Sequence, residues 1–135
     1  MKRKRVVTVF GAEGFIGSHF TQLLLRKNFK VNAVILYNSF SNYGHLSNVK
    51  NNNLKVIFGN VEDLDSCELA IKGSDYIVNF SALISIPYSY ISTESFIKTN
   101  IMGALNICRM IKKNKNSIKK FVQISSSEVY GSAKY

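Results

Sequence analysis

Residues 10–19 read Phe10-Gly11-Ala12-Glu13-Gly14-Phe15-Ile16-Gly17-Ser18-His19, and they lie where an apolar strand is expected to turn into a helix. A short β-branched run precedes them, and apolar residues recur at helical spacing from Phe15 onward. Gly11 permits a tight turn, Gly14 lets backbone amides approach a pyrophosphate, and Gly17 lets the helix pack close to the strand. The helix N-terminus attracts phosphate. The stretch therefore predicts a dinucleotide-binding turn rather than a glycine-rich turn without a ligand.

Size and composition indicate one domain with a hydrophobic core. The chain has 135 residues, of which 46% are hydrophobic and only one is proline. No segment approaches the roughly 20 apolar residues of a membrane span. The basic run at residues 2–5 is followed by apolar residues as in a signal peptide, but that apolar run is short and ends at Gly11. We therefore expect a cytoplasmic protein without membrane contact.

The net charge of +10 admits two interpretations. A nucleic-acid-binding surface is one of them. A solvated helix face on a chain that binds a phosphate-rich nucleotide is the other, and we favour it. The two cysteines and two histidines are too isolated in sequence to predict a metal site. Apart from the N-terminal run, the basic residues concentrate at Arg109, Lys112, Lys113, Lys115, Lys119 and Lys120.

Strand and helix patterns alternate along the chain. Strands are expected at residues 5–10, 31–36, 54–58, 76–80 and 121–124. One helix is expected over residues 14–28. A second is capped by Asp63 or Asp65 and closed by Gly73, and a third runs from Ser92 or Thr93 to about residue 113.

The fold class follows from the strand pattern. The expected strands are continuous apolar runs, which is typical of parallel strands covered by helices on both faces. Right-handed crossovers then favour an α/β, Rossmann-type doubly wound parallel sheet of strand order 3-2-1-4-5. The sequence ends soon after the fifth strand, which would leave a bare sheet edge. We therefore expect residues 1–135 to be a partial domain, truncated before the later strands and a substrate domain.

Several further motifs stand in order along the chain and carry a family resemblance. They are Gly59-Asn60-Val61, Phe80-Ser81-Ala82, the stretch 99–106 and Ser125-Ser126-Ser127-Glu128-Val129-Tyr130-Gly131. With the glycine motif, they make residues 6–131 resemble the extended short-chain dehydrogenase/reductases, in the NAD-dependent nucleotide-sugar epimerase/dehydratase branch. Residues 36–40 and 82–90 look most like the 4,6-dehydratases acting on UDP-N-acetylglucosamine in legionaminic-acid-type pathways. The string 127–131 is also similar to UDP-glucuronate decarboxylases.

The resemblance implies a cofactor site built from the ends of the strands and from the long helix. The residues that it assigns are Gly11, Gly14, Phe15, Ile16 and Gly17 for the pyrophosphate, Asn38 and Ser39 for the adenine ribose, Asn60 and Val61 for the adenine, Phe80, Ser81 and Ala82 for the nicotinamide side, and Asn100 for tying the long helix to the cofactor loop.

Two departures from the family pattern concern the cofactor. Family members commonly carry an acidic residue at the end of the second strand, where this chain has Tyr37-Asn38. No Arg or Lys stands there to hold a 2′-phosphate, which favours NAD over NADP. Asn60 stands where an Asp is usual, so the adenine contact should remain without its charge.

The resemblance also assigns catalytic roles. Ser126 takes the position that hydrogen-bonds the sugar O4, and Glu128 that of a catalytic carboxylate. Ser127 replaces an Asp that precedes the Glu in many hexose 4,6-dehydratases. Tyr130 and Lys134 have the spacing of the catalytic Tyr-x-x-x-Lys pair, but Gly131 is unfavourable inside a helix. The family's pair lies beyond residue 135, so we expect a loop tyrosine and a solvated lysine here.

The expected function is the N-terminal part of an NAD-dependent 4,6-dehydratase or epimerase that oxidises a UDP-sugar transiently at C4. The resemblance implies a homodimer when full length, and this fragment should be inactive. A UDP-glucuronate decarboxylase or a sugar 4-epimerase of the same family is an alternative. A non-catalytic dinucleotide sensor with a basic nucleic-acid-binding face is another. Ser126 and Glu128 argue against the sensor, which would need neither side chain.

Overall fold

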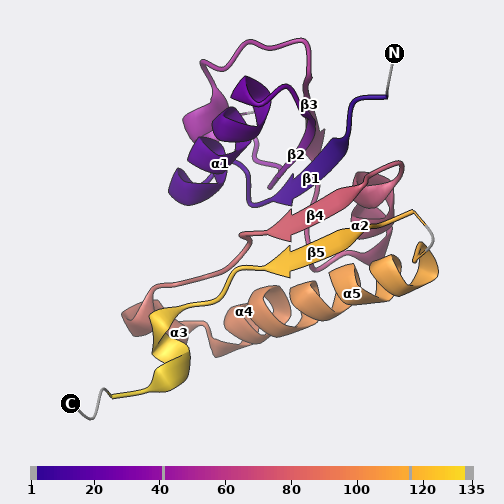
Figure 1. Cartoon of the computed structure of the whole chain (residues 1–135). Coiled ribbons are helices and arrows are strands. Elements are labelled where there is room, and N and C mark those ends of the chain that lie inside the picture. The colour runs from indigo at the N-terminus through magenta and orange to yellow at the C-terminus, as the bar shows by residue number, and fades with distance from the viewer. Residues whose placement is uncertain (1–2, 41, 116, 133–135) are drawn as a thin grey trace.

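A five-stranded parallel sheet of order β3-β2-β1-β4-β5 carries the fold (Figure 1). The computed structural model describes residues 3–40, 42–115 and 117–132. The strands are β1 (Val6–Phe10), β2 (Lys30–Ile35), β3 (Leu54–Phe58), β4 (Tyr76–Asn79) and β5 (Lys120–Gln123). The predicted fold class and strand order are confirmed, and each predicted strand boundary lies within one residue of the observed one.

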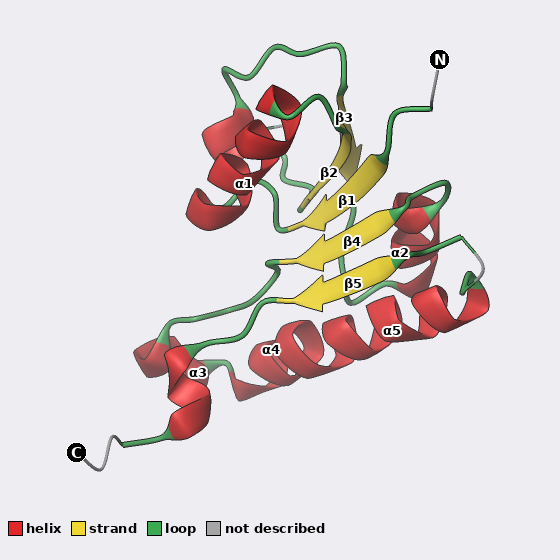
Figure 2. Cartoon of the chain, viewed as in Figure 1, coloured by secondary structure: helices red, strands yellow, loops and turns green. Residues whose placement is uncertain are grey.

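Helices cover both faces of the sheet and extend past the ends of its strands (Figure 2). The helical elements are α1 (Phe15–Arg26), η1 (Gly44–Leu46), α2 (Leu64–Ile71), α3 (Ile86–Ile91), α4 (Thr93–Phe96), η2 (Ile97–Gly103), α5 (Ala104–Lys113) and η3 (Ser127–Tyr130). Within the described residues, every helix is too short or too polar to span a bilayer.

Two hydrophobic clusters, one on each face of the sheet, form the core. On one face, Val9 and Ile35 of the sheet are buried with Leu25 of α1. On the other, Phe10 is buried with Ile71 of α2 and with residues of α5. Neighbouring residues of one strand thus enter different clusters, which is why apolar residues stand next to one another in the strands instead of alternating with polar ones.

The long helix predicted from residue 92 or 93 to 113 is one continuous helical rod made of α4, η2 and α5. Its middle part, η2, has π-helical hydrogen bonding. Such segments are rare and recur near functional sites. Gly103 ends η2, where a Cβ would lie 2.6 Å from Cγ2 of Val61. The rod therefore packs closely against the loop that follows β3.

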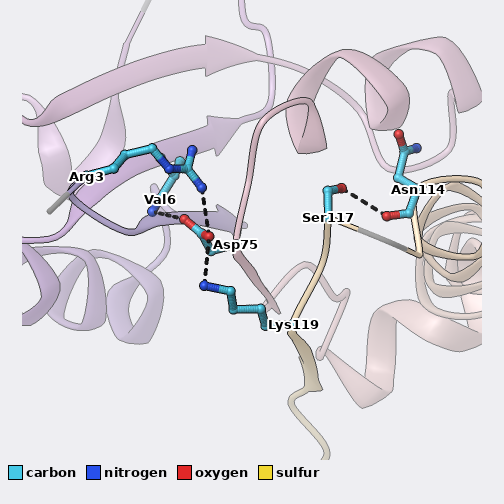
Figure 3. A network of polar contacts seen from close by, with 6 residues as sticks. All are labelled: Arg3, Val6, Asp75, Asn114, Ser117 and Lys119. Carbon is cyan, nitrogen blue, oxygen red and sulfur yellow. Dashed lines mark hydrogen bonds and ion pairs between the residues drawn. The ribbon is translucent and has the colours of Figure 1, made fainter.

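Asp75 joins three strands at their amino ends (Figure 3). Its side chain is only 3% exposed and lies immediately before β4. Asp75 Oδ1 accepts a bond from Arg3 at 2.8 Å and pairs with Lys119 at 3.3 Å, while Oδ2 accepts the Val6 N–H at 2.8 Å. Nearby, the Ser117 hydroxyl donates to the Asn114 carbonyl at 2.9 Å, in the turn that leads from α5 to β5.

The surroundings of Asp75 lower the pKa of its carboxyl group. Burial acts to raise this pKa, but the hydrogen bonds from Val6 and Lys119 and the charges of Arg3 and Lys119 outweigh burial. The folded-state pKa therefore lies below the ordinary value of 3.8. A carboxyl group whose pKa is lowered by folding stabilises the folded state at pH values above its unfolded-state pKa. This contribution is lost as the pH falls through the folded-state pKa.

Replacing Asp75 with Asn should lower the free energy of unfolding by about 1.5–3 kcal/mol at neutral pH, the range for hydrogen bonds to charged groups. The difference in unfolding free energy between the wild type and the variant should shrink as the pH falls below 3.8, because Asp75 of the wild type is then protonated and loses its negative charge. Urea denaturation at several pH values measures both effects. Glu68→Gln is the control, since its pair with Lys113 is exposed and worth under about 1 kcal/mol. Equal losses in both variants would contradict the role given to Asp75.

Candidate functional site

The turn from β1 into α1 is shaped by two glycines that the protein's own packing requires. Gly11 has φ +69°, and a Cβ there would lie 2.8 Å from the backbone nitrogen of Ser81. A Cβ at Gly17 would overlap the carbonyl oxygen of Gly11. The turn is thus packed against the segment after β4 on one side and against α1 on the other. Both positions exclude a side chain for reasons internal to the fold.

Gly14 differs, because nothing in the described protein requires a glycine there. Its backbone is extended (φ −69°, ψ 168°), and a Cβ would meet only the Gly11 carbonyl oxygen, at 3.5 Å. Gly14 caps α1, and in the described structure no side chain caps this end and no acidic residue occupies its first turn. The amides of the first turn are therefore left to an external anion, which the helix dipole favours. This end of α1 fits a phosphate group.

A cavity of about 320 Å³ lies at the carboxyl ends of the strands, beside this turn. It occupies the crevice where the strand order reverses around β1, the usual ligand position in such sheets. In Figure 1 the chain leaves the sheet here, at the tips of the arrows. The lining residues are Gly11, Glu13, Gly14, Val34, Leu36, Gly59, Asn60, Val61, Glu62, Phe80, Ser81, Ala82, Leu83 and Thr99.

The cavity brings together most of the residues predicted for a cofactor. From that set it is lined by Gly11, Gly14, Asn60, Val61, Phe80, Ser81 and Ala82. The loop after β3 is held in place by its own contacts. The Asn60 N–H donates to Ser66 Oγ, and Asn60 Oδ1 accepts the Glu62 N–H, both at 2.9 Å.

The remaining predicted cofactor residues do not line the cavity. The side chains of Phe15 and Ile16 are exposed on the first turn of α1, and Gly17 is buried. These residues can contribute their backbone amides to a phosphate, because the first amides of a helix have no partner within the helix. Asn38 and Ser39 lie in the loop after β2. The Asn38 side chain shapes that loop, because its Oδ1 accepts the Phe40 and Asn42 N–H groups.

Asn100, on η2, holds the loop after β4. Its Oδ1 accepts the Leu83 N–H at 2.8 Å, and its Nδ2 donates to the Leu83 carbonyl at 2.9 Å. Leu83 lines the cavity although Asn100 does not. Asn100 therefore fixes the position of a cavity-lining segment by bonding its backbone, without itself lining the cavity.

Among the cavity residues that were not predicted from the sequence, three have polar side chains: Glu13, Glu62 and Thr99. Glu13 lies between two of the motif glycines, and its Oε1 accepts the Leu36 N–H at 2.9 Å. Thr99 of η2 donates to Glu62 Oε1 at 2.6 Å. An acidic residue inside the glycine motif was a signal available for Glu13. The Glu62–Thr99 pair joins distant parts of the chain and has no local signal.

The predicted catalytic residues lie apart from the cavity, at η3 beyond β5. Ser126 caps this short helix, and its Oγ accepts the Glu128 N–H at 3.2 Å. Glu128 and Tyr130 are exposed. Gly131, with φ +66°, ends the helix directly after Tyr130. Lys134 lies outside the described residues.

Comparisons with known proteins agree with this geometry. Residues 8–135 match the family described as GDP-mannose 4,6 dehydratase. The chain is 30% identical to a dTDP-glucose 4,6-dehydratase of Streptomyces niveus, over 93% of this chain and 39% of that protein. It is 26% identical to an inverting UDP-N-acetylglucosamine 4,6-dehydratase of Campylobacter jejuni, over 95% of this chain and 40% of that protein.

Among solved structures, the chain resembles the dTDP-glucose 4,6-dehydratase DesIV of Streptomyces venezuelae, solved with NAD bound. The TM-score is 0.85 at 26% identity, over 96% of this chain and 42% of that one. The chain thus spans about two fifths of the length of these two curated relatives.

Proposed function

Because the chain belongs to the GDP-mannose 4,6 dehydratase family, we propose that it is the cofactor-binding part of an NAD-dependent nucleotide-sugar 4,6-dehydratase or epimerase. The observation that carries the proposal is the end of α1. Gly14 leaves room in front of amides that no described side chain caps, and this room opens on the cavity. A pyrophosphate matches both the space and the dipole there.

The chain's own residues divide the cavity into parts suited to a dinucleotide. The first turn of α1 would hold the pyrophosphate through backbone amides. Asn60 and Val61 would contact the adenine, and Phe80, Ser81 and Ala82 would line the nicotinamide side. NAD would supply the hydride acceptor for the sugar's C4. The NAD bound in the 26% identical structure supports this choice of cofactor.

Ser126 and Glu128 are the residues we propose for chemistry on the sugar. Because Ser126 Oγ accepts the Glu128 N–H, its hydroxyl hydrogen can be donated to the sugar O4. The exposed Glu128 carboxylate would remove the C5 proton once C4 is oxidised, as water leaves C6. The tyrosine that accepts the O4 proton would come from a further part of the protein.

The proposed substrate is a UDP-sugar, with UDP-N-acetylglucosamine as the first candidate. The relative from Campylobacter jejuni, named for that substrate, supports this choice. We further propose that the whole enzyme works as a cytoplasmic homodimer. Exposed apolar side chains such as Ile101 and Leu105, along η2 and α5, would supply a contact surface.

The 135-residue chain should bind NAD and yet form no product, because it spans only part of its relatives. Calorimetry with NAD measures the binding, and NMR after incubation with UDP-N-acetylglucosamine and NAD measures the 4-keto product. The whole protein should form that product. If the 135-residue chain forms it and Tyr130→Phe abolishes it, the local tyrosine is the catalytic one. A folded chain that binds no NAD would overturn the proposal.

A further inference from the structure

Glu13 carries a carboxylate oxygen that no described residue satisfies. Its Oε1 accepts the Leu36 N–H at 2.9 Å, but Oε2 is shielded from solvent and has no hydrogen-bond partner in the described part of the chain. A buried acceptor without a donor is costly, so such an atom calls for a partner. Glu13 also lines the cavity, which makes a ligand hydroxyl a suitable partner.

The position of Glu13 is held from several sides. Its carbonyl oxygen accepts the His45 N–H at 3.1 Å. Gly44 approaches so closely that a Cβ there would lie 2.7 Å from the Glu13 carbonyl oxygen. With the bond from Leu36, these contacts hold the side chain between the glycine turn and the end of β2. The terminal carboxylate torsion is soft, so a rotation about it can bring the unpaired oxygen toward the cavity when a ligand hydroxyl is there to bond it.

The end of β2 is where Rossmann-type domains recognise the adenine ribose, commonly through an acidic residue. In this chain Leu36, Tyr37 and Asn38 follow β2 and none is acidic. The oxygen of Asn38 already accepts two N–H groups of its own loop, at 3.2 and 3.0 Å. Glu13 brings a carboxylate to the same strand end from the other side, through the N–H of Leu36.

The charge of the cavity lining differs from that of the whole chain. The chain carries a net charge of +10, yet the lining contains two carboxylates, Glu13 and Glu62, and no Lys or Arg among the described residues. A 2′-phosphate would bring further negative charge beside Glu13 with no cation to pair it. A ribose 2′-hydroxyl would instead donate a hydrogen bond to the carboxylate.

We infer that Glu13 is the residue that recognises the adenine ribose of the cofactor and that its carboxylate selects NAD against NADP. This inference rests on the proposed function, because it needs a dinucleotide in the cavity. It assigns to the glycine turn a role that the end of β2 commonly has. Asn38 then stabilises the loop after β2 and does not bind the ribose hydroxyls.

The test is calorimetric titration of the purified chain with NAD, NADP and 2′-deoxy-NAD. The wild type should bind NAD about tenfold or more tightly than the deoxy analogue, as expected for loss of one charge-assisted hydrogen bond. In Glu13→Gln, which keeps an acceptor for Leu36, this discrimination should fall to within about threefold, and the NAD-to-NADP ratio should fall at least about tenfold. Glu68→Gln, which removes an exposed carboxylate elsewhere, should leave every affinity unchanged.

Further variants keep the inference falsifiable if Glu13→Gln fails to fold. Glu13→Asp keeps the charge but shortens its reach, so NAD should bind more weakly while NADP stays excluded. If Asn38→Ala removes the discrimination between NAD and its deoxy analogue and the Glu13 variants keep it, the inference is overturned. If the folded wild type binds none of the three ligands, the proposed function fails instead.

Discussion

Replacing Gly14 with valine should abolish NAD binding while the chain stays folded. A Cβ at this position meets only the Gly11 carbonyl oxygen at an ordinary 3.5 Å, and the extended backbone suits a β-branched residue. The branched side chain would nevertheless stand in front of the first amides of α1, where phosphate oxygens must approach. We expect the affinity to fall by at least about 100-fold, which corresponds to about 2.8 kcal/mol of lost binding free energy.

Two neighbouring substitutions separate ligand binding from folding. Gly14→Ala adds only the Cβ and should give a smaller loss of affinity with the same thermal midpoint. Gly17→Ala should instead destabilise the chain, because its Cβ would overlap the backbone of Gly11. Calorimetry gives the affinities, and circular dichroism with thermal melting reports the fold. If a folded Gly14→Val variant bound NAD with unchanged affinity, the proposed position of the pyrophosphate at this end of α1 would be wrong.

In the whole protein, Glu128→Gln should slow turnover by about 10²–10⁴-fold, the usual effect of losing a general acid–base group. NAD affinity should stay the same, because Glu128 does not line the cavity. The variant should also stop incorporating deuterium from D₂O at C5 of the product, since the carboxylate of Glu128 can take up the C5 proton and the amide of Gln cannot. Steady-state kinetics and NMR of the product made in D₂O measure the two effects.

The substrate pattern in the same experiments distinguishes the dehydratase from its alternatives. Glu68→Gln serves again as the matched control and should keep full activity, because its pair with Lys113 is exposed and distant in sequence from η3. Release of CO₂ from UDP-glucuronate, with no reaction of UDP-N-acetylglucosamine, would identify a decarboxylase. An unchanged rate in Glu128→Gln would exclude this carboxylate as the base.

The central strands could be predicted from the sequence because both faces of the sheet are buried there. In β1, residues 7–10 are all buried, and the strand predicted at residues 5–10 differs from the observed one by a single residue. The helix α3 was not predicted. It spans only Ile86–Ile91, none of its residues is buried, and its one local signal is Pro87 in the first turn.

The candidate site was predictable where a local motif shapes it. Gly11 and Gly17 predict close contacts between backbone segments, and the structure has such contacts at both positions. Glu13 was overlooked because its hydrogen bond with the Leu36 N–H forms only after β2 is paired with β1 in the sheet. The role implied for Asn38 followed from its position after β2, but sequence alone could not reveal that its oxygen is occupied within its own loop.

The Asp75 contacts and the cavity lie at opposite ends of the same strands. Asp75 joins residues that precede β1, β4 and β5, or begin them, whereas the cavity is lined mostly by residues that follow β1 to β4. Substitutions of Asp75 and its partners should therefore change the fraction of molecules that is folded, whereas substitutions of Gly14 or Glu13 should change the ligand that a folded molecule binds. At these positions, selection could adjust abundance and ligand preference separately.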